Sequence, residues 1–137
     1  MKNKMISLYV DGASRGNPGP AGIGVVVYND KKRIKELYKF IGETTNNIAE
    51  YNALLYGLEE ALIMKADRVN VHLDSELVVR QLNGEYRVKD PEIKILFDRA
   101  FHILKSFKGF EVKHVDRSEN KEADKLANKA INLRSLV

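Results

Sequence analysis

Two aspartates of this 137-residue sequence stand where an alternating segment ends. Asp11 closes segment 5–11 on the face opposite its apolar residues, and Asp74 closes segment 69–74 in the same way. A carboxylate at the carboxyl end of a strand lies where open α/β sheets bind their ligands. Asp74 taken alone equally suits the N-cap of a following helix, but two aspartates in equivalent positions favour a shared site.

Two further carboxylates fall on the apolar side of a helical pattern. Glu50 shares a stripe with Leu54, and Asp124 shares one with Ile131. A carboxylate in such a position is costly to bury unless a cation or a hydrogen-bond donor meets it. The alternative for each is a half-buried side chain at the edge of its stripe. Because the anomaly recurs on separate segments, we predict that both carboxylates join the two strand-end aspartates in one acidic site.

Four carboxylates in one site repel one another unless cations neutralise them. Ligand sets made only of oxygen suit Mg²⁺ or Mn²⁺ better than zinc. Shared carboxylates can hold two such ions roughly 3.5–4 Å apart, which clamps the attacking and leaving oxygens of an in-line phosphoryl displacement. The pattern therefore predicts metal-assisted hydrolysis of a phosphodiester.

The length and composition predict one soluble domain over residues 1–137. The sequence has no cysteine, which excludes disulfides, thiolate metal sites and cysteine nucleophiles. No apolar stretch approaches the ~20 residues of a membrane span, and segment 1–10 alternates instead of forming a signal peptide. We therefore expect a cytoplasmic protein without membrane contact. The formal net charge of +4 suits an anionic partner but is equally typical of a solubilising surface.

The periodicity predicts five strands and four helices that position these residues. Strands are expected at 5–11, 22–28, 33–42, 69–74 and 110–115, and helices at 44–65, 75–82, 90–107 and 118–133. The order βββ-α-β-α-α-β-α indicates an α/β domain with a mixed sheet. Suitable N-caps are Thr44 or Thr45, Asp90 and Ser118, and Gly109 can end the third helix.

Four segments resemble, in order, the motifs of the type 1 ribonuclease H family. YVDGASRGNPGPAG at 9–22 resembles the opening signature, and TTNNIAEY at 44–51 resembles the second motif. DSELVVRQL at 74–82 resembles the third, and RSENKEADKLAN at 117–128 resembles the last. The resemblance covers nearly the whole chain. It implies the ribonuclease H-like fold, a five-stranded mixed sheet flanked by helices. It also implies hydrolysis of the RNA strand of RNA–DNA hybrids, leaving a 5′-phosphate and a 3′-hydroxyl.

By this resemblance the four carboxylates are the catalytic residues and the ligands of two Mg²⁺ ions, which Mn²⁺ can replace. The implied ligands are Asp11, Glu50, Asp74 and Asp124, with Asp11 bridging the ions. The implied contacts to the hybrid come from Gly12, Arg15, Gly16, Asn17, Asn46, Asn47, Glu76 and Arg117. The alternative is that the glycine-rich run is only a turn and that the paired asparagines serve the start of a helix. No obligate protein partner is expected.

Two departures from the best-known family pattern bear on the reaction. Arg117 occupies the region where many members carry a loop histidine, and arginine binds phosphate but stays charged, so it does not shuttle protons. His114 lies close by, but its strand position indicates a structural role. Segment 83–90 is shorter than the basic protrusion of some members and has only Arg87 and Lys89 as cations. It therefore predicts weaker hybrid binding and looser substrate choice.

Several other interpretations stay open at the level of sequence. Lys121, Lys125 and Lys129 form a helical row that is either a phosphate-facing track or a solvated face. The whole chain is either a nuclease or a non-catalytic binding module on the same fold, because fold does not imply function. A third possibility keeps the chemistry but acts on double-stranded RNA or DNA junctions. The presence of all four carboxylates favours the nuclease, and the asparagine and glycine motifs favour hybrids.

Overall fold

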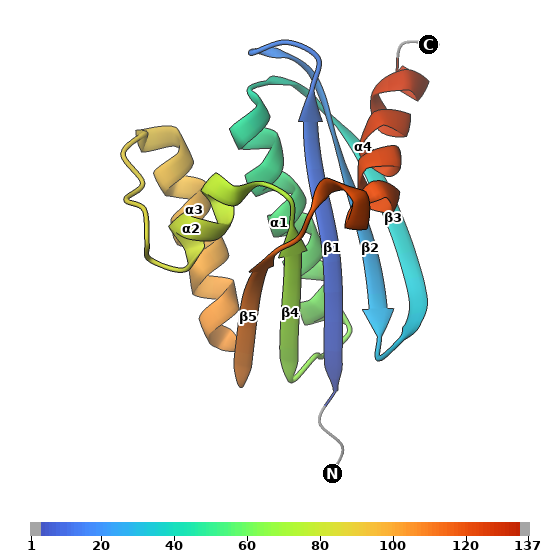
Figure 1. The fold of residues 1–137 in the computed structure, drawn as a ribbon, viewed down its shortest axis with the longest axis vertical. Helices are drawn as coiled ribbons and strands as arrows, with labels where there is room; N and C mark the ends of the chain where they lie inside the picture. The colour runs from blue at the N-terminus through green and yellow to red at the C-terminus, as the bar shows by residue number, and fades with distance from the viewer. Residues whose placement is uncertain (1–3, 135–137) are drawn as a thin grey trace.

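The computed structural model describes residues 4–134, which form a five-stranded mixed sheet with helices on both faces (Figure 1). The strands are β1 (Met5–Ser14), β2 (Gly19–Asn29), β3 (Lys32–Thr44), β4 (Arg68–Leu73) and β5 (Gly109–His114). Their order across the sheet is β3-β2-β1-β4-β5, in which the first three strands of the chain are antiparallel and the last two run parallel to β1. The predicted fold class is confirmed.

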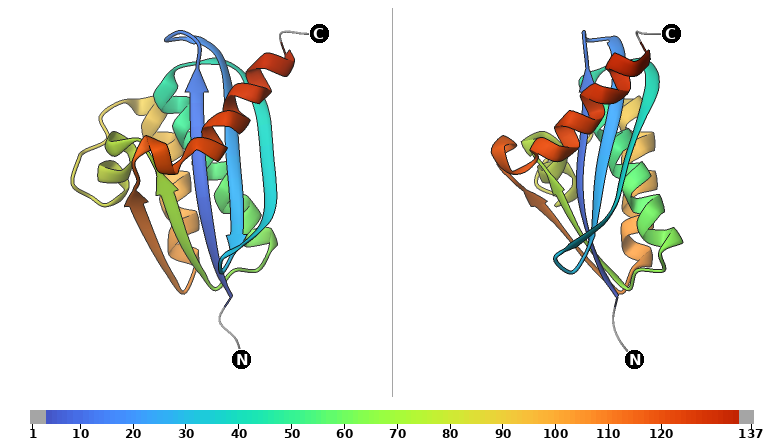
Figure 2. Two further views of the ribbon diagram at one scale, coloured as in Figure 1. Left: turned by 45° about the vertical axis from the view of Figure 1, so that its right-hand side comes forward. Right: turned by 90° about the vertical axis from the view of Figure 1, so that its right-hand side faces the viewer.

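The helices form a layer on each side of the sheet. α1 (Asn46–Ile63) and α3 (Pro91–Ser106) cover one face, and α4 (Lys121–Arg134) crosses the other (Figure 2). The short α2 (Glu76–Leu82) follows β4, and the 3-10 helix η1 (Arg117–Glu119) precedes α4. Within residues 4–134 no helix is long and apolar enough to span a membrane.

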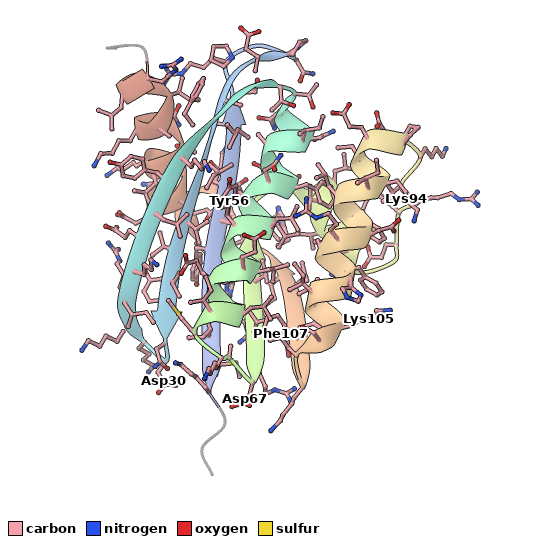
Figure 3. All side chains as sticks on the ribbon, turned by 180° about the vertical axis from the view of Figure 1, so that it is seen from behind. Asp30, Tyr56, Asp67, Lys94, Lys105 and Phe107 are labelled. Atoms are coloured by element: carbon pink, nitrogen blue, oxygen red, sulfur yellow. The ribbon has the colours of Figure 1, made fainter. Side chains whose placement is uncertain are left out.

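The main core lies between the sheet and the α1–α3 layer, which Figure 3 shows from behind. Alternate residues of β1, among them Leu8 and Val10, are fully buried and pack against the apolar stripe of α1. The aromatic residues of α3 and of the position that follows it enter this core to different degrees. Phe107 is buried, whereas Phe97 and Phe101 are half-buried and stack on each other at the surface of α3.

Side-chain caps fix where three helices begin. The Thr45 hydroxyl accepts the Ile48 N–H at the start of α1, and Asp90 accepts two N–H groups at the start of α3, so these predicted caps are confirmed. The Ser75 hydroxyl caps α2 by accepting the Val78 N–H. Asp74, the other candidate for that cap, is therefore free for another role.

The turn between the first two strands is much shorter than predicted. β1 continues past Asp11 to Ser14, and β2 begins at Gly19, so only residues 15–18 lie outside the sheet. Asp11 pairs with Gly24 inside the ladder and does not end its strand. The prediction failed because glycine and small residues look like a turn locally, whereas here they complete a long hairpin.

Two other predicted boundaries were wrong. Ser118 does not cap the last helix, because it lies in η1 and its hydroxyl donates to Asp116 Oδ2 over 2.7 Å. α4 begins three residues later, after Asn120. Gly109 does not end α3 but begins β5, because Phe107 already has an extended backbone.

Two glycines of β2 let α4 lie directly on the sheet. A Cβ atom on Gly24 would overlap the Ala123 carbonyl oxygen, and one on Gly22 would overlap the Ala127 carbonyl oxygen. Gly24 also faces Asp11 across the ladder. Since only glycine permits this approach, the two positions bring the first turns of α4 onto the strand beside Asp11.

We expect Gly24→Ala to lower the free energy of unfolding by about 1–3 kcal/mol, because the added methyl group meets the main chain of α4. Gly109→Ala is the matched control, since the nearest atoms to its methyl group would be those of the movable Arg68 guanidinium. Urea denaturation of both variants measures the difference. Equal stabilities of the two variants would contradict the glycine contact.

Candidate metal centre

Three carboxylates from separate elements meet at the centre of the sheet. Asp11 of β1, Glu50 of α1 and Asp74, just after β4, offer oxygens that all lie within 4.8 Å of one another. Asp11 is 6% exposed and Glu50 is 2% exposed, whereas Asp74 is half-buried. The structure thus brings together three of the four residues that the sequence singled out.

The fourth carboxylate, Asp124, lies at the rim of this group. Its side chain is exposed, although Ala127 and Ile131 further along the same stripe of α4 are buried. Its carboxyl group is still close enough to Asp11 to contribute to the raised pKa of that residue. Asp124 therefore faces the site from the solvent side and is not buried on the apolar stripe as the pattern predicted.

Gly12 sets the distance between β1 and α1. Its N–H donates to Glu50 Oε1 over 2.9 Å, and a Cβ atom here would overlap the main chain of Ala49. A larger residue would push the helix away and carry Glu50 out of reach of Asp11. Gly12, predicted to contact the substrate, is buried in this contact and holds a carboxylate in place.

Asn120 is a site residue that sequence analysis missed. It is 1% exposed, and its Nδ2 donates to the Val10 carbonyl over 2.9 Å and to Asp74 Oδ2 over 3.3 Å. Its carbonyl oxygen accepts the Asp124 N–H, so it stands at the first turn of α4. Asn120 thus joins the strand of Asp11, Asp74 itself and the helix of Asp124. An asparagine just before a helix was the available signal, but the nearby serine was preferred as the cap.

The three clustered carboxylates lack a neutralising partner. Among the described residues no lysine or arginine forms an ion pair with them. Burial, and then the charges of Glu50 and Asp74, raise the pKa of Asp11 far above its ordinary value. Burial also raises the pKa of Glu50, against the opposing effects of the neighbouring Asp11, of the hydrogen bond from the Gly12 N–H and of the Arg117 charge.

The donor set fits a divalent cation. Glu50 Oε2 is buried and has no hydrogen-bond partner, which is costly for a carboxylate oxygen unless a cation meets it. All available ligands are carboxylate oxygens, which hard cations such as Mg²⁺ and Mn²⁺ prefer. The residues present therefore suit such an ion.

The glycine-rich turn and the start of α1 lie together beside this cluster. The Asn46 N–H donates to Asn17 Oδ1 over 3.1 Å, and Asn17, Asn46, Asn47 and Gln81 line a cavity of about 310 Å³. Arg15 and Gly16 are exposed in the same turn. The structure thus gathers most of the residues predicted to contact a hybrid on one surface.

The remaining predicted contacts are more scattered. Arg117 is exposed on η1, and its charge acts to lower the pKa of Glu50. Glu76 is exposed at the start of α2 and pairs with Arg80 over 2.8 Å. Lys129 lies over the ring of Tyr38 on β3, which indicates packing on the sheet edge in place of a phosphate track.

The three histidines have no place among the carboxylates. His72 stacks on Tyr9, and its Nδ1 lies 3.0 Å from the Leu8 carbonyl oxygen. His102 is exposed on α3, and His114 is exposed at the end of β5. A structural role for His114 stays a prediction.

Comparisons with known proteins agree with this fold. The family model described as reverse transcriptase-like matches residues 9–130. Ribonuclease HI of Halobacterium salinarum is 42% identical over 92% of this chain and 64% of its own length. Ribonuclease H of Clostridium botulinum is 33% identical over 93% of this chain and 96% of its own length. The chain spans only 35% of a bifunctional protein of Mycobacterium tuberculosis, to which it is 40% identical.

Solved structures give the same assignment. LC11-RNase H1, solved in complex with an RNA/DNA hybrid, is 45% identical and superposes with a TM-score of 0.88 over 96% of this chain and 99% of its own. The sheet and the helix layers define an α/β domain with the ribonuclease H-like fold. The chain belongs to the type 1 ribonuclease H family.

We expect Asp11→Asn to stabilise the metal-free protein at neutral pH by about 1–3 kcal/mol. The folded-state pKa values of Asp11 and Glu50 are raised, so the protonated carboxyls contribute stability that is full below about pH 4 and is lost as the pH rises through the folded-state values. Urea denaturation in a chelator should show that the free energy of unfolding falls less between about pH 4 and pH 8 in the variant than in the wild type. A steeper loss in the variant would contradict the repulsion.

We expect Mn²⁺ to raise the melting temperature of the wild-type protein, because the cation binds only the folded cluster. A free concentration of 100 times the dissociation constant adds about 2.7 kcal/mol of stability. Asp74→Asn should lose most of this shift, since Asp74 supplies one of the clustered oxygens. Thermal unfolding with Mn²⁺ and with sodium chloride of equal ionic strength separates binding from screening. An equal shift in the variant would argue against the site.

Proposed function

We propose that this protein is an endoribonuclease that hydrolyses the RNA strand of RNA–DNA hybrids, with residues 1–137 as one catalytic domain. The observation that carries the proposal is the cluster of Asp11, Glu50 and Asp74, with a buried carboxylate oxygen that has no partner. The family membership and the 45% identical relative solved with an RNA/DNA hybrid support the substrate. The cytoplasmic location stays a prediction.

Two divalent cations, Mg²⁺ or Mn²⁺, would activate water and stabilise the charge that develops on the phosphate and on the leaving 3′ oxygen. Asp11 and Glu50 would hold them from the buried side, Asp74 from the next strand and Asp124 from the solvent rim. Asn120 would orient Asp74 by its hydrogen bond. The chain needs no nucleophile of its own, and the products would be a 5′-phosphate and a 3′-hydroxyl.

The surface beside the cluster supports recognition of a hybrid. Exposed Asn17, Asn46 and Asn47 offer neutral donors and acceptors that suit a ribose 2′-hydroxyl, which is the group that distinguishes RNA from DNA. Arg15 and Arg117 are exposed cations that suit phosphates. Gly16 has a φ of 132°, a backbone conformation that favours glycine. Because glycine has no Cβ atom, the nucleic acid can approach the main chain closely at this position.

The segment between α2 and α3 bears on affinity. Residues 83–90 contain no helix, and they connect the two helices directly. With only Arg87 and Lys89 as cations, this segment would add little phosphate contact, so hybrid binding would be weaker and less dependent on salt.

The test is cleavage of an end-labelled RNA–DNA hybrid with Mg²⁺ or Mn²⁺, beside double-stranded RNA and duplex DNA. We expect metal-dependent cutting of the RNA strand only, with a loss of more than about 100-fold in Asp11→Asn, because that variant removes a proposed ligand. Glu76→Gln is a control for substrate binding, because it should change the KM for the hybrid more than it changes kcat. Tight hybrid binding without cutting under either metal would instead favour a non-catalytic binding module.

A further inference from the structure

The carboxamide of Asn128 connects Asp124 to the turn between β1 and β2. Its Nδ2 donates to the Asp124 carbonyl over 3.0 Å and to Asp124 Oδ1 over 3.3 Å. Its Oδ1 accepts from Arg15 Nη2 over 3.3 Å, and its main-chain oxygen accepts from the same nitrogen over 3.5 Å. These partners fix the orientation of the amide, because only its nitrogen donates and only its oxygen accepts.

Helix formation does not explain asparagine at this position. Asn128 lies in the middle of α4, where asparagine is a poorer helix former than alanine. Its neighbours Ala127 and Ala130 show that alanine suits this helix. The residue one turn before it is Asp124, which is the correct spacing for a side-chain contact. The contact with Asp124 and Arg15 is therefore the physical reason for an amide here.

The turn that holds Arg15 is itself tied to the opposite helix layer. The Ser14 hydroxyl donates to the Thr44 carbonyl over 2.7 Å, and Asn17 accepts the Asn46 N–H at the start of α1. Arg15 reaches across to α4 from the same turn. The turn thus connects the helix that carries Glu50 with the helix that carries the fourth carboxylate.

We propose that Asn128 is a positioning residue that aims the Asp124 carboxylate at Asp11, and that Arg15 holds the Asn128 amide in the required orientation. This rests on the proposed function, in which Asp124 is a metal ligand. Asp124 is exposed and lies outside the tight group of three, so its direction depends on such a partner. Without the amide the carboxylate turns towards solvent, and the cation loses a ligand.

The experiment compares Asn128→Ala with the wild type. Removing a group that orients a ligand weakens metal binding by about 10-fold, measured as free Mn²⁺ by electron paramagnetic resonance without nucleic acid. The KM for the hybrid at saturating Mn²⁺ should stay within about twofold, and the melting temperature in chelator should not fall, because alanine favours the helix. Asn83→Ala is the matched control, since it removes a similar amide bond to a main-chain oxygen, that of Val112, which involves no carboxylate.

A double-mutant cycle decides whether Asn128 acts through Asp124. In the Asp124→Asn background, Asn128→Ala should cause no further loss of Mn²⁺ affinity. Wild-type affinity in Asn128→Ala, or a full additional loss in the double variant, would overturn the proposal. A wild type that binds Mn²⁺ but cuts no hybrid would refute the proposed function alone, because the binding cycle still decides the role of Asn128. A wild type that binds no Mn²⁺ would refute both.

Discussion

The structure depends on one constraint: a strand and a helix must touch main chain to main chain so that two buried carboxylates can meet. Gly12 makes this possible, because any side chain there would overlap the backbone of Ala49. Its N–H satisfies one oxygen of Glu50 and leaves the other without a partner. Burying like charges in this way opposes folding, so a well-packed core under α1 has to hold the strand and helix together.

The same close approach recurs on the other face of the sheet, where Gly22 and Gly24 admit α4. The two helices therefore reach the central strand from opposite sides, one with Glu50 and the other with Asp124. Asn120 joins these layers, since it bonds to β1 and to Asp74 while standing at the start of α4. The candidate site is thus the point at which every layer of the fold meets, which explains why its residues are spread from the first strand to the last helix.

Periodicity predicted the element order because alternation and helical stripes record which face of each element is buried. It failed where pairing between distant segments outweighs local preference, as at Ala13 and Ser14, which continue β1 by pairing with β2. It also failed at the last helix, because the bonds of Asn120 to Val10 and Asp74 are absent from any local pattern. The four carboxylates could be found because each interrupts the apolar pattern of its segment. The position of Asp124 on a helical stripe, however, does not give its distance from the other three carboxylates.

The carboxylate cluster is negative, whereas the whole chain has a positive net charge. Under the proposed function, this contrast links the binding of the divalent cation to the binding of the hybrid. The formal net charge of +4 attracts a polyanion, yet the clustered carboxylates repel each phosphate that comes close to them. Under the proposed function a bound cation reverses that local repulsion, and a phosphate in turn strengthens the hold on the cation. Because coupling between two ligands is reciprocal, metal and hybrid must each raise the affinity for the other by the same factor. Arg117, whose charge already acts on Glu50, lies where it can add to this coupling without replacing the cation.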